Sequence, residues 1–113
     1  MMYIDFNAGG KQYKLRLNTR NTIGLEKALG GNPLEFFTKL KGDDTPKVET
    51  MVTILYYSLK AYNEDITLEK TFDIFDTWLD EEENSIDGFI AIIVEIYKVS
   101  GLIKVKKSVA EKN

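Results

Sequence analysis

The chain has 113 residues, a formal net charge of −3 and a calculated pI of about 5.0, and it contains neither cysteine nor histidine. This length fits a single domain that buries its own hydrophobic core, and the acidic balance argues against a nucleic-acid partner. Without Cys and His, the chain lacks a disulfide framework, a thiol nucleophile, a His-based triad and the usual zinc or haem ligands.

The N-terminal segment predicts a β-hairpin over residues 2–18. Apolar and polar side chains alternate along it, and Gly9-Gly10 suits a tight turn because glycine adopts positive φ at no steric cost. A lone hairpin is marginal in water, so its apolar face is expected to pack on the rest of the chain. The predicted inward residues are Met2, Ile4, Phe6, Tyr13, Leu15 and Leu17.

Capping residues, prolines and glycines predict five helices after the hairpin. They cover about residues 20–29, 33–41, 46–62, 68–82 and 86–100. The expected start signals are Thr19, Asn32-Pro33, Thr45-Pro46, Thr67 and Ser85.

Apolar residues at three- and four-residue spacing predict which side of each helix faces the core. The last helix is apolar nearly all round from Phe89 to Tyr97, so it is expected to lie centrally in the core or to be covered by a partner. The predicted inward residues of the other helices include Ile23, Leu25, Ala28 and Leu29 in the first, Val48, Met51, Val52, Leu55, Leu59 and Tyr62 in the third, and Leu68, Phe72, Ile74, Phe75, Trp78 and Leu79 in the fourth.

These elements predict an α+β fold that is mainly α, with an antiparallel hairpin packed on a bundle of about five helices. Residues 1–103 are expected to form one domain, and residues 104–113 a mobile basic tail. The longest apolar run, Phe89–Val94, is far too short for a membrane span, and the N-terminus has no signal-peptide pattern. The expected location is the cytoplasm of the host cell.

Five aromatic residues are the candidate partner-binding residues. Adjacent aromatics cannot both face the same side of a helix, so one member of each pair is expected outside the core, where aromatics favour partner recognition. A wide core stripe explains the same pattern equally well. The candidates are Phe36, Phe37, Tyr56, Tyr57 and Trp78.

Acidic residues gather in the run 80–83, with Asp73 and Asp76 one turn earlier. Their spacing does not match an EF-hand loop, and a solvated charged face explains them better than a cation site. We therefore predict no metal and no cofactor. A small enzyme working through these carboxylates remains a third alternative, but it would need two of them to converge in one pocket.

Six short segments carry a resemblance to a known family. They are GKQYKLRL (10–17), TIGLEKALG (22–30), NPLEFF (32–37), TILYYSLKAYN (53–63), ITLEKTFD (66–73) and IYKVSGL (96–102). In this order they resemble the small tail assembly chaperones of long-tailed (siphovirus-type) phages and prophages of Gram-positive bacteria. The resemblance covers about residues 2–102, and none of the segments is a catalytic motif.

The resemblance implies a non-catalytic morphogenesis factor. Such a factor binds and solubilises the tape measure protein before the tail tube polymerises around it, helps to recruit tube subunits, and is absent from the mature virion. Self-association is also expected, since an apolar helix often forms an oligomer interface. The alternative is a generic helical protein-interaction module, adaptor or antitoxin-like, that uses the same helical surface.

Overall fold

The computed structural model describes residues 2–40 and 46–104. Its elements, in chain order, are β1 (Ile4–Ala8), β2 (Lys11–Leu15), α1 (Thr19–Leu29), α2 (Glu35–Leu40), α3 (Val48–Lys60), α4 (Leu68–Leu79) and α5 (Ile86–Val99). The predicted fold class, mainly helical with an N-terminal antiparallel hairpin, is therefore confirmed. The predicted start at Thr45 and the predicted mobile tail after Lys104 lie outside the described residues.

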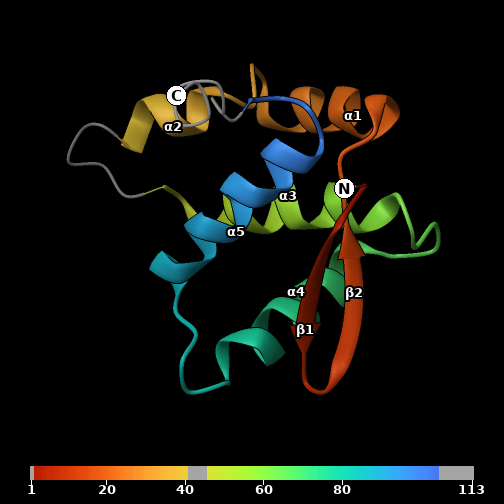
Figure 1. The fold of residues 1–113 in the computed structure, drawn as a ribbon, viewed down its shortest axis with the longest axis vertical. Coiled ribbons are helices and arrows are strands. Elements are labelled where there is room, and N and C mark those ends of the chain that lie inside the picture. The colour runs from red at the N-terminus through yellow and green to blue at the C-terminus, as the bar shows by residue number, and fades with distance from the viewer. Residues whose placement is uncertain (1, 41–45, 105–113) are drawn as a thin grey trace, which may run out of the picture.

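Helix α3 is the centre of the arrangement. It lies between α1 on one side and the hairpin and α4 on the other, and α5 packs across it (Figure 1). Six of its side chains are buried, over slightly less than half of its circumference. Every other main element therefore takes its position from contacts with this helix or with its immediate neighbours.

Except at Met2, the hairpin has the predicted faces. β1 pairs antiparallel with β2, and Phe6 lies opposite Tyr13. The turn places Gly9 at φ 60° and Gly10 at φ 82°, the left-handed conformation that a two-residue primed hairpin turn requires. The inner face packs on the helices, where the ring of Phe6 stacks on the indole of Trp78 with centroids 5.9 Å apart.

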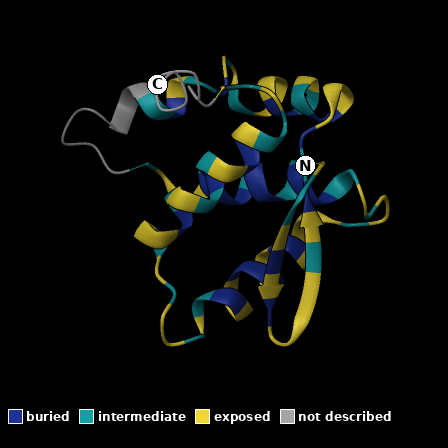
Figure 2. Cartoon of the chain, viewed as in Figure 1, coloured by how far each residue is buried: buried dark blue, intermediate teal, exposed yellow. Residues whose placement is uncertain are grey.

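Helix α5 packs one face into the core. The side chains of Phe89, Ile93, Ile96 and Tyr97 have no exposed area. Figure 2 shows that buried residues gather on the sides of the helices that face one another and the hairpin. One face of α5 is therefore in the core, whereas Ala91, Glu95 and Lys98 on the opposite face are exposed.

Polar bonds fix the C-terminal end of α5 to the hairpin. The guanidinium of Arg16 donates to the carbonyl oxygen of Val99 at 3.1 Å, and the Leu17 amide donates to Oγ of Ser100 at 2.8 Å. A cation is favourable at a helix C-terminus, where unpaired carbonyls concentrate negative potential. Gly101, at φ 84°, then turns the chain back so that Leu102 packs against the core.

Tyr97 connects α5 with the turn before α2. Its hydroxyl donates to the carbonyl oxygen of Pro33 at 3.1 Å, and both groups are buried. Burial raises the pKa of the Tyr97 hydroxyl, because the phenolate would lose its hydration. The neutral, donating form of Tyr97 is thus part of the folded state.

Two predicted helix caps are confirmed and one is wrong. The side chains of Thr67 and Ser85 accept amides three residues further on, as expected of N-caps. Asn18, not Thr19, caps α1, because Asn18 is extended (φ −81°, ψ 176°) and its Oδ1 accepts from Asn21 N at 2.8 Å.

Several predicted helix bounds are too wide. α2 and α3 begin at Glu35 and Val48, two residues after the prolines expected at their first positions. Residues 33–34 instead form a turn, in which Oδ1 of Asn32 accepts the Leu34 amide at 2.9 Å. α4 ends at Leu79 rather than at residue 82, since three further carboxylates at a helix C-terminus would oppose the helix dipole.

The predicted inward faces contain a set of errors. Six large apolar side chains that the sequence places inward are between 41% and 64% exposed. The buried faces of α3 and α4 are rotated relative to the predicted stripes, and they include the polar residues Ser58 and Thr71, whose hydroxyls bond to carbonyls one turn earlier. The six exposed residues are Met2, Ile23, Val48, Tyr62, Leu68 and Phe72.

Candidate partner-binding surfaces

Two of the five predicted partner-binding aromatics lie in the core. Phe36 is 5% exposed and Trp78 is 6% exposed. Trp78 belongs to an aromatic cluster with Phe75 and Phe89, with ring centroids 5.1 to 6.0 Å apart. The structure corrects the prediction for Phe36 and Trp78, because a buried side chain cannot reach a partner while the fold is intact.

The other three predicted aromatics are half-buried and contact neighbours within the chain. The ring of Phe37 meets that of Tyr97 edge-on at 5.3 Å. Tyr57 lies against Gly24 of α1, where a Cβ atom would come within 2.7 Å of the tyrosine ring. Tyr56 stands beside it, and the Lys60 ammonium lies 5.1 Å from its ring centroid. Their role in partner binding remains a prediction.

Helix α4 exposes an apolar pair instead. Leu68 and Phe72 are each 44% exposed and stand four residues apart, so they lie on one face of the helix. The helix turns this face outward because the side chains of Thr71, Ile74, Phe75 and Trp78 occupy its buried face. Packing within the monomer does not account for a phenylalanine that is exposed to this extent.

Carboxylates flank this apolar pair. Glu69, Asp73 and Asp76 stand at three- and four-residue spacing, so they form an exposed row next to Leu68 and Phe72. Nine of the chain's 18 acidic residues, but one of its 15 basic residues, lie between positions 64 and 83. Within the described residues the one ion pair joins Lys98 and Glu95, so the α4 carboxylates have no cationic partner there. We call Leu68, Phe72, Glu69, Asp73 and Asp76 the α4 surface.

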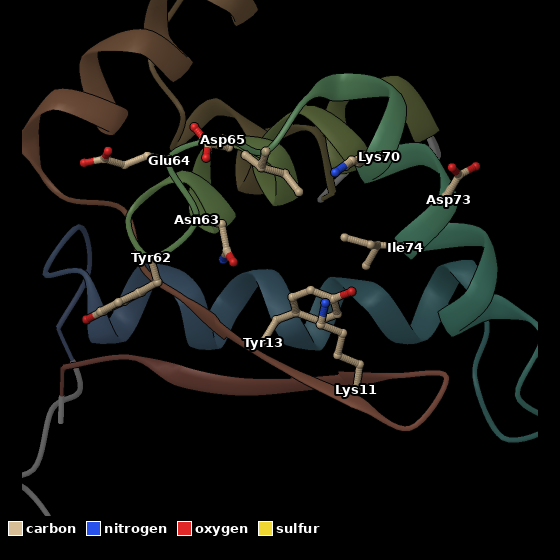
Figure 3. A pocket seen from close by; sticks show the side chains of 10 residues that line it. Lys11, Tyr13, Tyr62, Asn63, Glu64, Asp65, Lys70, Asp73 and Ile74 are labelled. Carbon is tan, nitrogen blue, oxygen red and sulfur yellow. The ribbon is translucent and has the colours of Figure 1, made fainter.

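A groove lies next to the α4 surface, between α4, β2 and the α3–α4 connection. Its volume is about 520 Å³. Figure 3 shows the side chains of Tyr13, Lys70 and Ile74 directed into it, whereas those of Glu64 and Asp73 point away. Aromatic, aliphatic and cationic groups are thus directed into the groove, and the carboxylates of Glu64, Asp65 and Asp73 also belong to its lining. We call it the β2 groove.

The acidic residues do not converge on one another. Asp73, Asp76 and Asp80 are exposed, and the Glu81 carboxylate accepts the Gly9 amide at 3.1 Å. Among the residues that the structure describes, no three carboxylates are placed to hold a metal ion.

Within residues 2–40 and 46–104, no helix is both long and apolar enough to cross a membrane.

The α4 surface was missed because Leu68 and Phe72 fit a helical apolar stripe. A stripe through Thr71, Ile74, Phe75 and Trp78 has the same period, and nothing in the spacing says which of the two faces the core. The usable signal was the row of carboxylates beside Phe72, since acids avoid the edge of a buried face.

Comparison with protein-family models, with curated proteins and with solved structures finds no match. The resemblance to tail assembly chaperones therefore rests on the six quoted segments.

Proposed function

We propose that this protein is a phage tail assembly chaperone, which binds and solubilises the tape measure protein during tail morphogenesis and is absent from the mature virion. The six segments that carry the resemblance coincide with β2, α1, the turn leading into α2, α3, α4 and the end of α5. The resemblance thus extends over nearly every element of the described fold rather than over one local motif.

The observation that carries the proposal is the exposed pair Leu68 and Phe72 on the α4 surface. A chaperone for an apolar client needs apolar contact area on a charged body that stays in solution. The carboxylate row supplies the charge, and the two side chains supply the contact at the spacing by which helices recognise one another.

The charges of the α4 surface also define the client chemistry. Carboxylates without cationic partners beside an apolar pair are complementary to an amphipathic helix with lysine or arginine next to its apolar face. Tail tube subunits and a second copy of the chain remain further partners in the proposal. Self-association through α5 would use residues outside its buried face, because Phe89, Ile93, Ile96 and Tyr97 are occupied by the core.

Binding accounts for this arrangement better than catalysis does. An enzyme built on carboxylates needs two of them in one pocket, and Asp73, Asp76 and Asp80 are separately exposed instead. Within the described residues no buried polar side-chain atom lacks a hydrogen-bond partner. No buried side chain there is held in the unsatisfied state that often marks a reactive site.

Co-expression with the tape measure protein of the same phage or prophage tests the proposal. We expect the tape measure protein to move into the soluble fraction and to form a complex of defined mass by light scattering. The double variant Leu68→Ser/Phe72→Ser should abolish this effect, because it removes the apolar contact and retains every charge.

The matched control is Ile23→Ser/Val48→Ser, which removes two apolar side chains of similar exposure, 47% and 42%, from α1 and α3. This variant should solubilise the tape measure protein as well as the native chain does. A tape measure protein that stays insoluble with the native chain would contradict the proposal. The generic interaction module would then be the better description.

A further inference from the structure

The backbone of β2 offers hydrogen-bonding groups away from β1. In a hairpin with a two-residue turn, the pair that closes the turn exchanges hydrogen bonds, and the next pair does not. The closing pair is Ala8 and Lys11, so the amides of Gln12 and Lys14 point outward. Arg16 confirms this alternation, because its amide donates outward to the Ser58 carbonyl at 3.1 Å.

These outward groups have no acceptor among the described residues. The last outward amide of this edge, that of Arg16, already donates to the Ser58 carbonyl of α3. The amides of Gln12 and Lys14 take part in no hydrogen bond of the described fold beyond the hairpin itself. An edge strand with free N–H and C=O groups is a template for another strand.

The β2 groove runs along this free edge. Figure 3 shows β2 as one wall, α4 and the α3–α4 connection as the other, and Tyr62 near one end. Tyr13, on the inner face of β2, and Ile74 of α4 both point into the groove. A strand laid on the free edge would therefore send alternate side chains into a space of about 520 Å³.

We propose that an extended segment of a partner protein adds to β2 as a third strand and fills the β2 groove. The paired stretch spans about three residues, because Arg16 is already bonded and the turn follows Lys11. Asp73 belongs to the α4 surface and also lines this groove, but the strand edge that pairs is that of β2. The inference does not depend on the partner being a tape measure protein.

The groove also selects the side chains of the segment. One inward side chain meets Tyr13 and Ile74 and is apolar. The inward side chain two residues away lies near Lys11 and Lys70, whose ammonium groups have no carboxylate within ion-pairing distance in the described part of the chain. That second side chain is a carboxylate, by charge complementarity.

The experiment uses the full chain labelled with ¹⁵N and the peptide acetyl-Thr-Ile-Thr-Glu-Thr-amide as the probe. We expect its addition to shift the amide signals of Gln12, Lys14 and Ile74, and to slow hydrogen exchange at Gln12 and Lys14. The amide of Asn7, outward on the opposite edge, is the internal control and should not change. Replacing Glu by Lys in the peptide should weaken binding by about tenfold, which is the scale of one charge-assisted contact.

Proline variants separate strand addition from other binding. Gln12→Pro removes an outward amide without removing a bond to β1, and proline is tolerated at such edge positions. It should abolish peptide binding, whereas Asn7→Pro, which makes the same change on the β1 edge, should leave binding intact. Should Gln12→Pro fail to fold, Lys70→Glu serves instead and should reverse the preference between the Glu and Lys peptides.

Three outcomes would overturn the inference. The first is an absence of any shift along β2 at millimolar peptide. The second is equal binding by the Gln12→Pro and Asn7→Pro variants. The third is protection of Gln12 and Lys14 that grows with protein concentration without peptide, which would assign the edge to a second copy of this chain. Failure of the co-expression test would leave these results unaffected, so the two proposals fail separately.

Discussion

Helices α4 and α5 are both rich in apolar residues, but the fold uses them differently. α5 has the higher apolar content, and four of its side chains, those of Phe89, Ile93, Ile96 and Tyr97, are completely buried. α4 is amphipathic, yet it leaves Leu68 and Phe72 nearly half exposed. The helix with the higher apolar content thus buries its largest side chains within its own chain, and the amphipathic helix is the one that leaves two large apolar side chains nearly half exposed.

The difference shows that apolar content alone does not identify a binding surface. Both helices pack on α3 and on β1. α5 places its large apolar side chains on the face toward these neighbours or at the edges of that face, so none of them is among the exposed large apolar side chains. α4 packs on its neighbours with one face, so any apolar residue beyond that face meets solvent. If this comparison is correct, equal substitutions in α5 and α4 will have very unequal effects.

The largest expected effect is that of Ile93→Asp. Ile93 has no exposed area, and a carboxylate there would be buried without a partner. The variant should be unfolded at room temperature, with a loss of more than about 4 kcal/mol in unfolding free energy. Circular dichroism measures this directly, and a native helical spectrum with an unchanged melting temperature would contradict the central position of α5.

Truncating Phe89 of α5 gives the buried half of the comparison with Phe72 of α4. Phe89→Ala should cost about 3–5 kcal/mol, because it opens a cavity among the rings of Phe6, Phe75 and Trp78. Urea unfolding followed by the fluorescence of Trp78 would measure the loss. A cost below about 1 kcal/mol would mean that the aromatic cluster packs differently.

Tyr97→Phe tests the polar link between α5 and the turn before α2. Loss of the hydrogen bond to Pro33 should cost about 1 kcal/mol at neutral pH, since the carbonyl stays buried without its donor. Burial raises the pKa of Tyr97 above the ordinary value of 10.0, so above that pH the unfolded chain ionises while the folded chain does not. Ionisation of the unfolded chain lowers the stability of the native protein as pH rises above 10.0, and the Phe variant lacks this loss.

The difference in unfolding free energy between native protein and Tyr97→Phe should therefore shrink above pH 10.0 and stay constant below it. Urea unfolding of the two proteins across that pH range measures this difference. A constant difference at all pH values would show that Tyr97 is accessible to water.

The smallest expected effect is that of Phe72→Ser on stability. The side chain is 44% exposed and outside the buried face of α4, so the unfolding free energy should change by less than about 1 kcal/mol. The same urea unfolding experiment measures it. A loss comparable to that of Phe89→Ala would place Phe72 in the core and remove the α4 surface.

The fold was predictable because its local signals agree with one another. Alternation along the hairpin, the turn at Gly9-Gly10 and the caps at Thr67 and Ser85 each depend on nearby residues only. Helix starts at Pro33 and Pro46 were placed too early, because a proline suits the turn before a helix as well as its first position.

The surfaces were not predictable, because they depend on the rotation of each helix in the assembled fold. Thr71 can face inward because its hydroxyl donates a hydrogen bond to the Thr67 carbonyl and is therefore satisfied when buried. With Thr71 on the buried face, the next residue, Phe72, faces outward. The β2 groove joins Tyr13 with Ile74, far apart in sequence, and no local pattern reports that distance.

Site-specific photo-crosslinking from α4 tests the central claim most directly. A benzoylphenylalanine placed at Phe72 in the full chain would be irradiated in cells that also make the tape measure protein, with the same group at Ile23 as the control. The account predicts a crosslink to the tape measure protein from position 72 and none from position 23. Crosslinks from both positions or from neither, in cells where the tape measure protein is present, would contradict the assignment of the α4 surface as its binding site.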